Sequence, residues 1–249
     1  MIRNLTEDVT WVSVCYPHED EHEHVSVYVV ETAGGNVLVD SGSFHHEDEI
    51  MAGIEEAVGD DGIDAIVLSH SDYPHSANID EVREEYDDVE LVASSGAPEV
   101  QGLSDARRCV IGEDLDVLGR TFEFIDPPLA DRSHTTWILD TESGVLFTAD
   151  GFGNYHAPDE CGRFSDDFEG STPEEEIYRF HRDNLGWLRY VDSDKLRAAI
   201  DDIFAEFEIR AVAPIHGNPI VEDDIPVYLD RLERAAARIA AEYEVPAAD

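Results

Sequence analysis

The feature that most constrains the fold is a short apolar run followed at once by three potential metal ligands. Segment 63–68 is mainly aliphatic and β-branched and follows an Asp-Asp-Gly turn, which predicts a buried strand. The motif His70-x-Asp72-x-x-His75 then lies on the loop that leaves this strand. A loop can turn all three side chains toward one point, whereas an extended strand would send His70 and His75 to opposite faces. The motif therefore predicts the start of a metal site.

Further ligands are expected from other segments, because three ligands leave a metal ion under-coordinated. His134 lies just before an apolar strand at 137–139, Asp150 follows a second strand at 145–149, and His216 ends an apolar strand before a glycine. Each has an ordinary alternative, since a lone histidine is often structural and an Asp-Gly pair often forms a turn. Their common position at strand margins favours a role as ligands, because loops at strand ends carry many binding residues.

Two residues are candidates for supporting such ligands. Asp40 ends a strand at 37–39 and is either a turn former or a carboxylate that orients a ligand histidine. His24 lies directly before the strand expected at 25–31 and could reach the pocket that holds the metal site. Its neighbours His18 and His22 stand in an acid-rich stretch, which predicts a solvated loop.

The remaining pattern predicts an α/β chain with helices packed outside sheets. Further strands are expected at 91–93 and 211–215 with two short ones within 107–124, and helices after His46, at 79–86, from 172, from 193 and from 225 to about 243. Thr172 is expected to cap its helix, with Pro173 at the first helical position. No linker rich in Pro, Gly or Ser divides the sequence, so residues 1–249 are expected to form one domain.

The net charge of -42, from 58 acidic and 16 basic residues, makes nucleic acid an improbable partner. The acids are interspersed with periodic apolar residues, which predicts a carboxylate-coated globular surface of the halophilic type rather than disorder. Cys15, Cys109 and Cys161 are widely separated and form no CxxC pair, so neither a disulfide nor a cysteine zinc site is expected. With no apolar leader and no uncharged apolar run long enough to cross a membrane, a cytoplasmic protein is expected.

The order of the candidate ligands resembles that of the metallo-β-lactamase superfamily, and most closely its flavodiiron and oxygen-binding di-iron branch. Asp72 is a carboxylate where the hydrolytic branches usually carry histidine, and Leu146 to Gly153 is similar to the strand, bridging aspartate and Phe-Gly segment of that branch. Two helices, a strand and a His-Gly pair lead to His216, and this order is also similar to that of the branch. The resemblance implies an αββα sandwich with the site at one edge between the sheets.

The resemblance also implies two metal ions, iron or alternatively zinc. His70, Asp72 and His134 would bind one ion, His75 and His216 the other, and Asp150 both. The family's glutamate is the shorter Asp72 here, and an aspartate of the family's motif is replaced by Pro74, which has no donor atom in its side chain. A weakly held second metal is therefore expected.

Three functions follow from the resemblance. The first is a non-haem di-iron protein that binds or reduces dioxygen or nitric oxide, and the second is a zinc-dependent hydrolase of an ester, thioester or phosphodiester. The third is an oxygen or redox sensor without turnover. The family's flavodoxin-like FMN domain is missing from this sequence, so electrons are expected from a separate flavoprotein, a rubredoxin-like donor or a neighbouring subunit of a homodimer.

Overall fold

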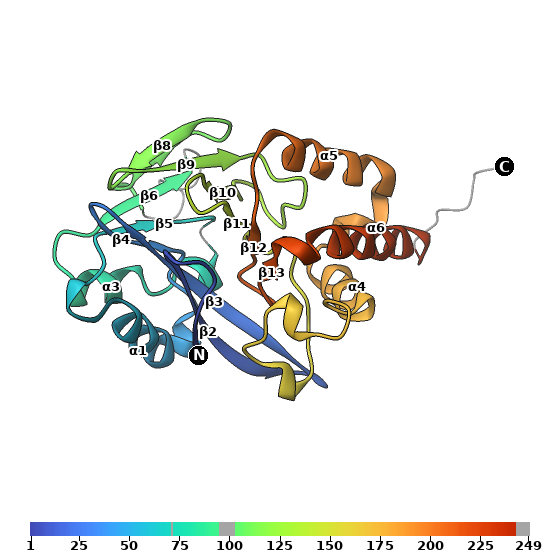
Figure 1. Cartoon of the computed structure of the whole chain (residues 1–249), viewed down its shortest axis with the longest axis horizontal. Coiled ribbons are helices and arrows are strands. Elements are labelled where there is room, and N and C mark those ends of the chain that lie inside the picture. Colours follow the sequence, from blue (N-terminus) through green and yellow to red (C-terminus); the bar gives the residue numbers. More distant parts are fainter. Residues whose placement is uncertain (71, 95–102, 243–249) are drawn as a thin grey trace.

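Two mixed β-sheets face each other across the centre of the molecule, and helices cover their outer faces (Figure 1). The computed structural model describes residues 1–70, 72–94 and 103–242. Within these ranges the first sheet has the order β1 (Ile2–Asn4), β2 (Val9–His18), β3 (Glu21–Thr32), β4 (Gly35–Val39), β5 (Ala65–Val67), β6 (Glu90–Ser94) and β7 (Arg107–Cys109). The second has the order β13 (Ile220–Val221), β12 (Ala211–Ala213), β11 (Val145–Phe147), β10 (Trp137–Asp140), β9 (Arg120–Ile125) and β8 (Asp114–Val117).

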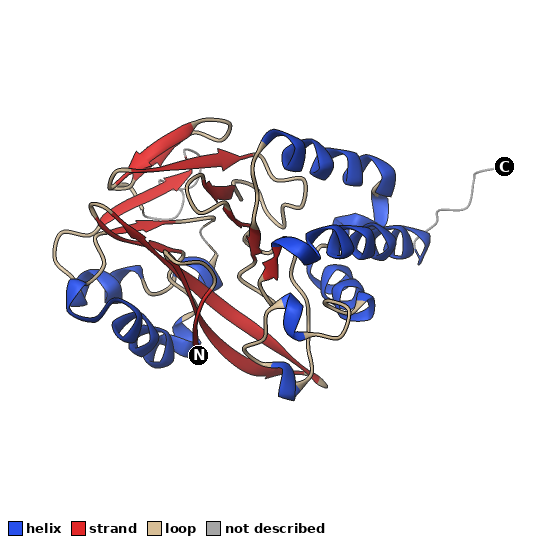
Figure 2. Ribbon diagram, viewed as in Figure 1, coloured by secondary structure: helices blue, strands red, loops and turns tan. Residues whose placement is uncertain are grey.

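The helices fall into two groups, one outside each sheet, as Figure 2 shows in blue. They are α1 (Glu47–Val58), α2 (Tyr73–Ser76) and α3 (Ile79–Glu85) in the first half, and α4 (Glu174–Asn184), α5 (Ser193–Glu206) and α6 (Ile225–Glu242) in the second. Short 3-10 turns lie at η1 (Phe44–His46), η2 (Gly59–Asp61), η3 (Pro158–Glu160), η4 (Ser165–Asp167), η5 (Gly186–Tyr190) and η6 (Glu222–Asp224). Within the described ranges, no helix is both long and apolar enough to cross a bilayer.

Three buried apolar clusters hold the sheets and helices together. Strand β4 illustrates how, because Val37 and Val39 point into the cluster between the sheets while Leu38 points into the cluster under α1 and α3. A strand whose alternate residues are buried on both faces reads as a continuous apolar run, as the sequence does here. The third cluster joins the second sheet to α4, α5 and α6. The expected αββα sandwich is confirmed.

Most expected elements are present, with differences at their ends. The strand predicted before the metal motif is β5, and the motif itself enters the one-turn helix α2, whose first turn accommodates Pro74. The predicted helix from 172 begins at Glu174 with Pro173 as its cap, and segment 107–124 holds parts of three strands rather than two. The predicted end of the last helix near Tyr243 lies outside the described residues.

Two predictions near the N-terminus are wrong. The stretch assigned to a solvated loop is the paired end of β2 and start of β3, where His18 pairs with Glu21 and Pro17 with His22. Glu19 and Asp20 at the turn are exposed, but Glu23 and His24 are buried against other parts of the protein. A disulfide joins Cys15 to Cys161, with 5.9 Å between the Cα atoms and 146 residues between them in sequence. Cys109 is buried and free.

Candidate metal centre

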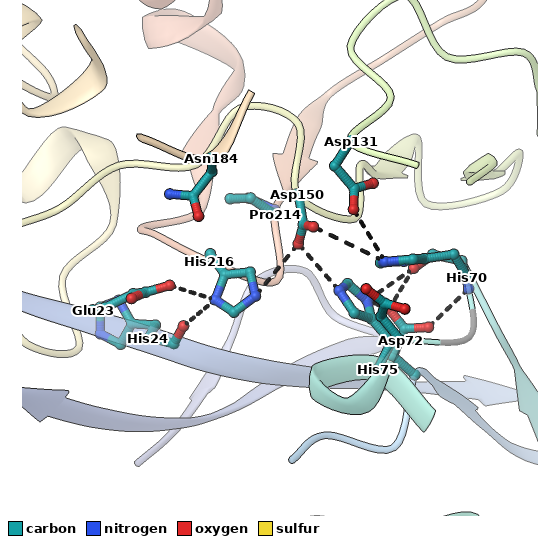
Figure 3. Close-up of polar contacts among 12 residues, drawn as sticks. Glu23, His24, His70, Asp72, His75, Asp131, Asp150, Asn184, Pro214 and His216 are labelled. Atoms are coloured by element: carbon teal, nitrogen blue, oxygen red, sulfur yellow. Dashed lines mark hydrogen bonds and ion pairs between the residues drawn. The ribbon is translucent and has the colours of Figure 1, made fainter. Parts of the chain in front are cut away.

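Three histidines converge on the carboxylate of Asp150 at the edge between the two sheets (Figure 3). Asp150 Oδ1 lies 3.1 Å from His75 Nε2 and 3.3 Å from His216 Nε2, and Asp150 Oδ2 lies 4.0 Å from His70 Nε2. The four residues follow the ends of β5, β11 and β12 or lie in α2, so parallel strand ends bring distant segments together. The structure thus places four of the predicted ligands around one point.

A second group of ligand atoms shares His70. Its members are His70, Asp72 and Asp131, and their ligand atoms all lie within 4.8 Å of one another. The Oδ2 atom of Asp131 is 3.5 Å from His70 Nε2. His70, His75 and Asp150 form the other group by the same criterion. Two overlapping groups joined by one histidine have room for two neighbouring ions.

The structure does not bring His134 into either group. Its side chain is exposed, its backbone has a φ of 71°, and its carbonyl oxygen accepts a hydrogen bond from Ser94 Oγ at 3.0 Å. Asp131, three residues earlier in the same loop, points to His70 instead (Figure 3). Sequence reasoning missed Asp131, because nothing in its spacing distinguishes it from the many other acids of the chain.

Asp40 holds His75 in a fixed orientation. Its Oδ2 atom lies 2.9 Å from His75 Nδ1 and accepts the hydroxyl of Ser69 at 2.7 Å, while its Oδ1 atom accepts the amide of Ser69 at 2.8 Å. A proton on Nδ1 donates to this carboxylate and leaves Nε2 directed at Asp150. Such a carboxylate partner fixes the tautomer of a metal-binding histidine, which is the supporting role considered for Asp40.

His216 is held in a similar way by residues of β3. Its Nδ1 atom lies 2.8 Å from Glu23 Oε1 and 2.9 Å from the carbonyl oxygen of His24 (Figure 3). His24 therefore reaches the centre through its backbone, whereas its ring stacks on His156, away from Asp150. Glu23 was missed because its acid-rich surroundings predicted a solvated loop. The alternation of the extended β3 would have placed it on the pocket side.

The charges of this cluster shift its proton equilibria. Burial opposes charge on His75, but Asp40 and Asp150 outweigh burial and raise the pKa of His75 to about 10. Burial likewise opposes the charge on His216, and its bond to Glu23 raises the pKa of His216 above the ordinary value. The same histidines overcome the effect of burial on Asp150 and hold its pKa well below the usual range. Without a metal, protonated histidines therefore neutralise the buried carboxylates.

The donor set fits a metal ion. His70 is 4% exposed, and neither of its ring nitrogens has a hydrogen-bond partner among the described residues. An unsatisfied buried polar group costs roughly 1–3 kcal/mol, a cost that a bound ion at this position would remove. Imidazole and carboxylate ligands together suit iron, manganese or zinc.

A pocket of about 760 Å³ opens onto these ligands. At its rim, exposed Arg132 forms an ion pair with Asp72, so Asp72 is the ligand candidate nearest to solvent. The pocket is lined by Tyr16, His18, Glu23, Asp72, Tyr73, Pro74, His75, Asp131, Arg132, Asp150, Asn184 and His216. A small molecule entering from solvent would meet His75, Asp150 and His216 directly.

The chain is similar to known proteins in sequence and in fold. Residues 21–202 match the model of the metallo-beta-lactamase superfamily. The coenzyme F420H2 oxidase of Methanocaldococcus jannaschii is 26% identical over 163 residues, which cover 63% of this chain and 39% of the relative. The type A flavoprotein fprA of Rhodobacter capsulatus is 24% identical over 228 residues, which cover 87% of this chain and 50% of the relative.

Solved structures agree on the fold. The rubredoxin oxygen:oxidoreductase of Desulfovibrio gigas superposes with a TM-score of 0.79 at 18% identity, over 95% of this chain and 62% of that one. The matched segments cover 39% and 50% of the two curated relatives above, so the chain spans half of their length or less. Because the family model covers most of the chain and the two facing sheets agree with that fold, the chain belongs to the metallo-beta-lactamase superfamily.

Proposed function

We propose that this protein is a non-haem di-iron protein that binds or reduces dioxygen or nitric oxide, using electrons from another protein. One observation carries the proposal: Asp150 lies between three histidines, and one of these, His70, is shared with a second, carboxylate-rich group. A carboxylate between two histidine-bearing groups can hold two metal ions side by side.

The proposed ligands divide between two ions. His70, Asp72 and Asp131 would hold the first ion, His75 and His216 the second, and Asp150 both. In this proposal Asp131 takes the place that the family resemblance implied for His134. Bound iron would supply a redox-active ion with open coordination positions for a diatomic ligand. The second ion has fewer protein ligands, because Pro74 stands where another carboxylate was expected.

The chain's own residues position the ligands and hold protons near them. Asp40 and Glu23 fix the rings of His75 and His216 through their Nδ1 atoms. Burial, followed by the neighbouring charge of Glu23, raises the pKa of Tyr16 well above its ordinary value. Tyr16 also lines the pocket, where its phenol keeps its proton and donates it in a hydrogen bond to the carboxylate of Glu23.

The relatives favour an oxidoreductase over the zinc hydrolase that the ligand set also allows. Their names are an F420H2 oxidase, a flavoprotein and a rubredoxin oxygen:oxidoreductase. We therefore propose a flavoprotein or a rubredoxin-like protein as the electron donor. A sensor that binds the gas without turnover would use the same site, and a measurement of gas consumption distinguishes it from an enzyme.

The test begins with anaerobic purification at high salt, followed by metal analysis and measurement of dioxygen and nitric oxide consumption with a flavin reductase and NADH as electron source. About two iron ions per chain and gas consumption are expected. Asp150→Asn should lose both, whereas Asp116→Asn, a matched change at an exposed site, should lose neither. Stoichiometric zinc without iron, together with esterase activity, would replace the proposal with the hydrolase. Iron that binds the gas without consuming it would identify a sensor.

We propose that residues 1–249 form one domain and that the protein works in the cytoplasm at high salt, where counterions screen the surface carboxylates. A homodimer is proposed as well. Sedimentation in molar salt tests the oligomeric state.

A further inference from the structure

Two cysteines and two histidines meet at a second place in the molecule, outside the pocket of the metal centre. Cys15 Sγ lies 3.3 Å from His22 Nδ1 and 3.3 Å from His156 Nε2, and Cys161 Sγ lies 3.5 Å from His22 Nδ1. Cys15 stands in β2 and His22 in β3, while His156 and Cys161 belong to the segment after β11. In Figure 1 this yellow segment lies beside the far ends of β2 and β3.

The backbone dictates this convergence. Cys15 pairs with His24 across the β2–β3 ribbon, so Cys15, His22 and His24 share one face, since side chains alternate along a strand. His22 and His156 then form an isolated antiparallel bridge, with amide-to-carbonyl hydrogen bonds of 2.8 and 3.1 Å in the two directions. Main-chain pairing thus positions Cys15, His22 and His156, and Cys161 follows directly after η3.

From this arrangement we propose that the reduced protein binds a zinc ion through Cys15, His156 and Cys161, whose ligand atoms lie within 4.8 Å of one another, with His22 as the fourth ligand. Tetrahedral zinc has bonds of about 2.3 Å to sulfur and 2.0–2.1 Å to nitrogen, which places ligand sulfur and nitrogen about 3.5 Å apart. The three sulfur–nitrogen distances in this cluster, 3.3, 3.3 and 3.5 Å, agree with that separation. Two thiolates and two imidazoles are a common ligand set for structural zinc.

Zinc and the Cys15–Cys161 disulfide exclude each other, because a sulfur–sulfur bond removes the thiolates. A phosphine reductant with water breaks this bond, supplies two electrons and two protons to give two thiols, and becomes the phosphine oxide. Zinc then displaces the two thiol protons and forms two bonds to sulfur and two to nitrogen. The site is therefore available in the reduced protein and absent from the disulfide form.

The surroundings suit a structural ion. His156 is 1% exposed, and its ring stacks on that of His24 with 4.2 Å between centroids, which fixes its direction. Cys15, His22 and Cys161 are half-buried, so an ion can enter from solvent. The ion would tie the segment after β11 to the β2–β3 ribbon when no disulfide does so.

This site differs from the metal centre in position and in chemistry. Tyr16 and Glu23 on the opposite face of the ribbon line the pocket, whereas none of the four proposed zinc ligands does. The metal centre offers imidazole and carboxylate, and thiolates are softer ligands that prefer zinc to iron in a two-histidine, two-cysteine set. The inference therefore stands whether or not the proposed di-iron function is correct.

Cobalt provides a direct probe, because cobalt bound to thiolates has a charge-transfer band in the near ultraviolet that histidine and carboxylate ligands do not produce. The full chain is reduced with a phosphine, freed of metal and titrated anaerobically with Co²⁺ and then with Zn²⁺. We expect the thiolate band and tetrahedral visible bands to saturate at one equivalent and to disappear on adding zinc. Zinc should also protect two thiols from a disulfide reagent.

The variants separate this site from other causes. Cys15→Ser should roughly halve the thiolate band, because Cys161 remains, while Cys109→Ala, at the buried free cysteine, should leave the band unchanged. His156→Gln retains both thiols and should lose the tetrahedral visible bands, which tests the site even if a cysteine variant misfolds. If the reduced protein loses tertiary structure, zinc should restore its near-ultraviolet circular dichroism. A reduced protein with reactive thiols but no thiolate band, or a band of unchanged intensity in Cys15→Ser, would overturn the proposal.

Discussion

Asp40→Asn should weaken metal binding at His75 without emptying the rest of the centre. In the native protein both oxygens of Asp40 accept hydrogen bonds, from the amide and hydroxyl of Ser69 and from His75 Nδ1. An asparagine must turn its NH2 either toward the Ser69 amide or toward His75 Nδ1. The first orientation sets two donors against each other, and the second forces the proton of His75 onto Nε2, the atom that faces Asp150.

The expected loss follows from this conflict. Removing such a partner typically weakens metal binding about 10- to 100-fold, which is about 1.4–2.7 kcal/mol. Proton release provides a second measure: with a pKa of about 10, His75 carries a proton at neutral pH that metal must displace. Asp40→Asn removes the larger of the two charges that raise this pKa, so fewer protons should leave per metal bound.

Calorimetric titration of the apo-protein with Fe²⁺, in buffers of different ionisation enthalpy, measures affinity and proton release together. The matched control is Asp64→Asn, a partly buried carboxylate that accepts the amide of Asn36 at 2.9 Å. That variant should bind metal as the native protein does. Equal affinity and equal proton release in Asp40→Asn and the native protein would refute the role given to Asp40.

Three other predictions concern the same centre. Asp131→Ala should lower the iron content of the anaerobically purified protein and His134→Ala should not; equal losses would contradict the placement of Asp131 beside His70. Mild chelation should remove the second ion first, and Pro74→Asp should raise its occupancy in a ferrous titration, whereas two equal, tight sites in the native protein would argue against a deficit at Pro74. Because the folded pKa of His75, about 10, lies above its ordinary 6.5, its stabilisation of the metal-free protein is complete below about pH 6.5 and is lost as pH rises through about 10. Urea unfolding at both pH values should show this loss, with a smaller change in Asp40→Asn.

The sequence was informative where regular structure dictates position. Apolar runs placed His70, Asp150 and His216 at strand ends, where loops carry many binding residues, and the family resemblance then implied that these ends share one edge. The loop before β10 has no such regularity. There a φ of 71° at His134 turns that residue outward, and Asp131 points inward instead. Backbone conformations of this kind are set by packing across the whole fold rather than by local composition.

The β2–β3 ribbon was missed for a different reason. Its acidic composition resembles that of a solvated loop, yet several of its side chains have specific partners in the folded protein, as Glu23 does in His216 and Glu21 does in Arg179. The pairing of Cys15 with Cys161 was equally hidden, because the two lie 146 residues apart and come together only when the segment after β11 crosses the ribbon.

The two faces of this ribbon also restrict how the chain can change in length. Tyr16 and Glu23 on one side serve the pocket, and Cys15 and His22 on the other meet at the disulfide. Inserting or deleting a single residue in one strand would exchange the faces and deliver each set of side chains to the wrong neighbour. The hairpin can therefore lengthen or shorten only by two residues at a time. In homologous proteins, we expect the side chains on either face of the ribbon to change by point substitution more often than by insertion.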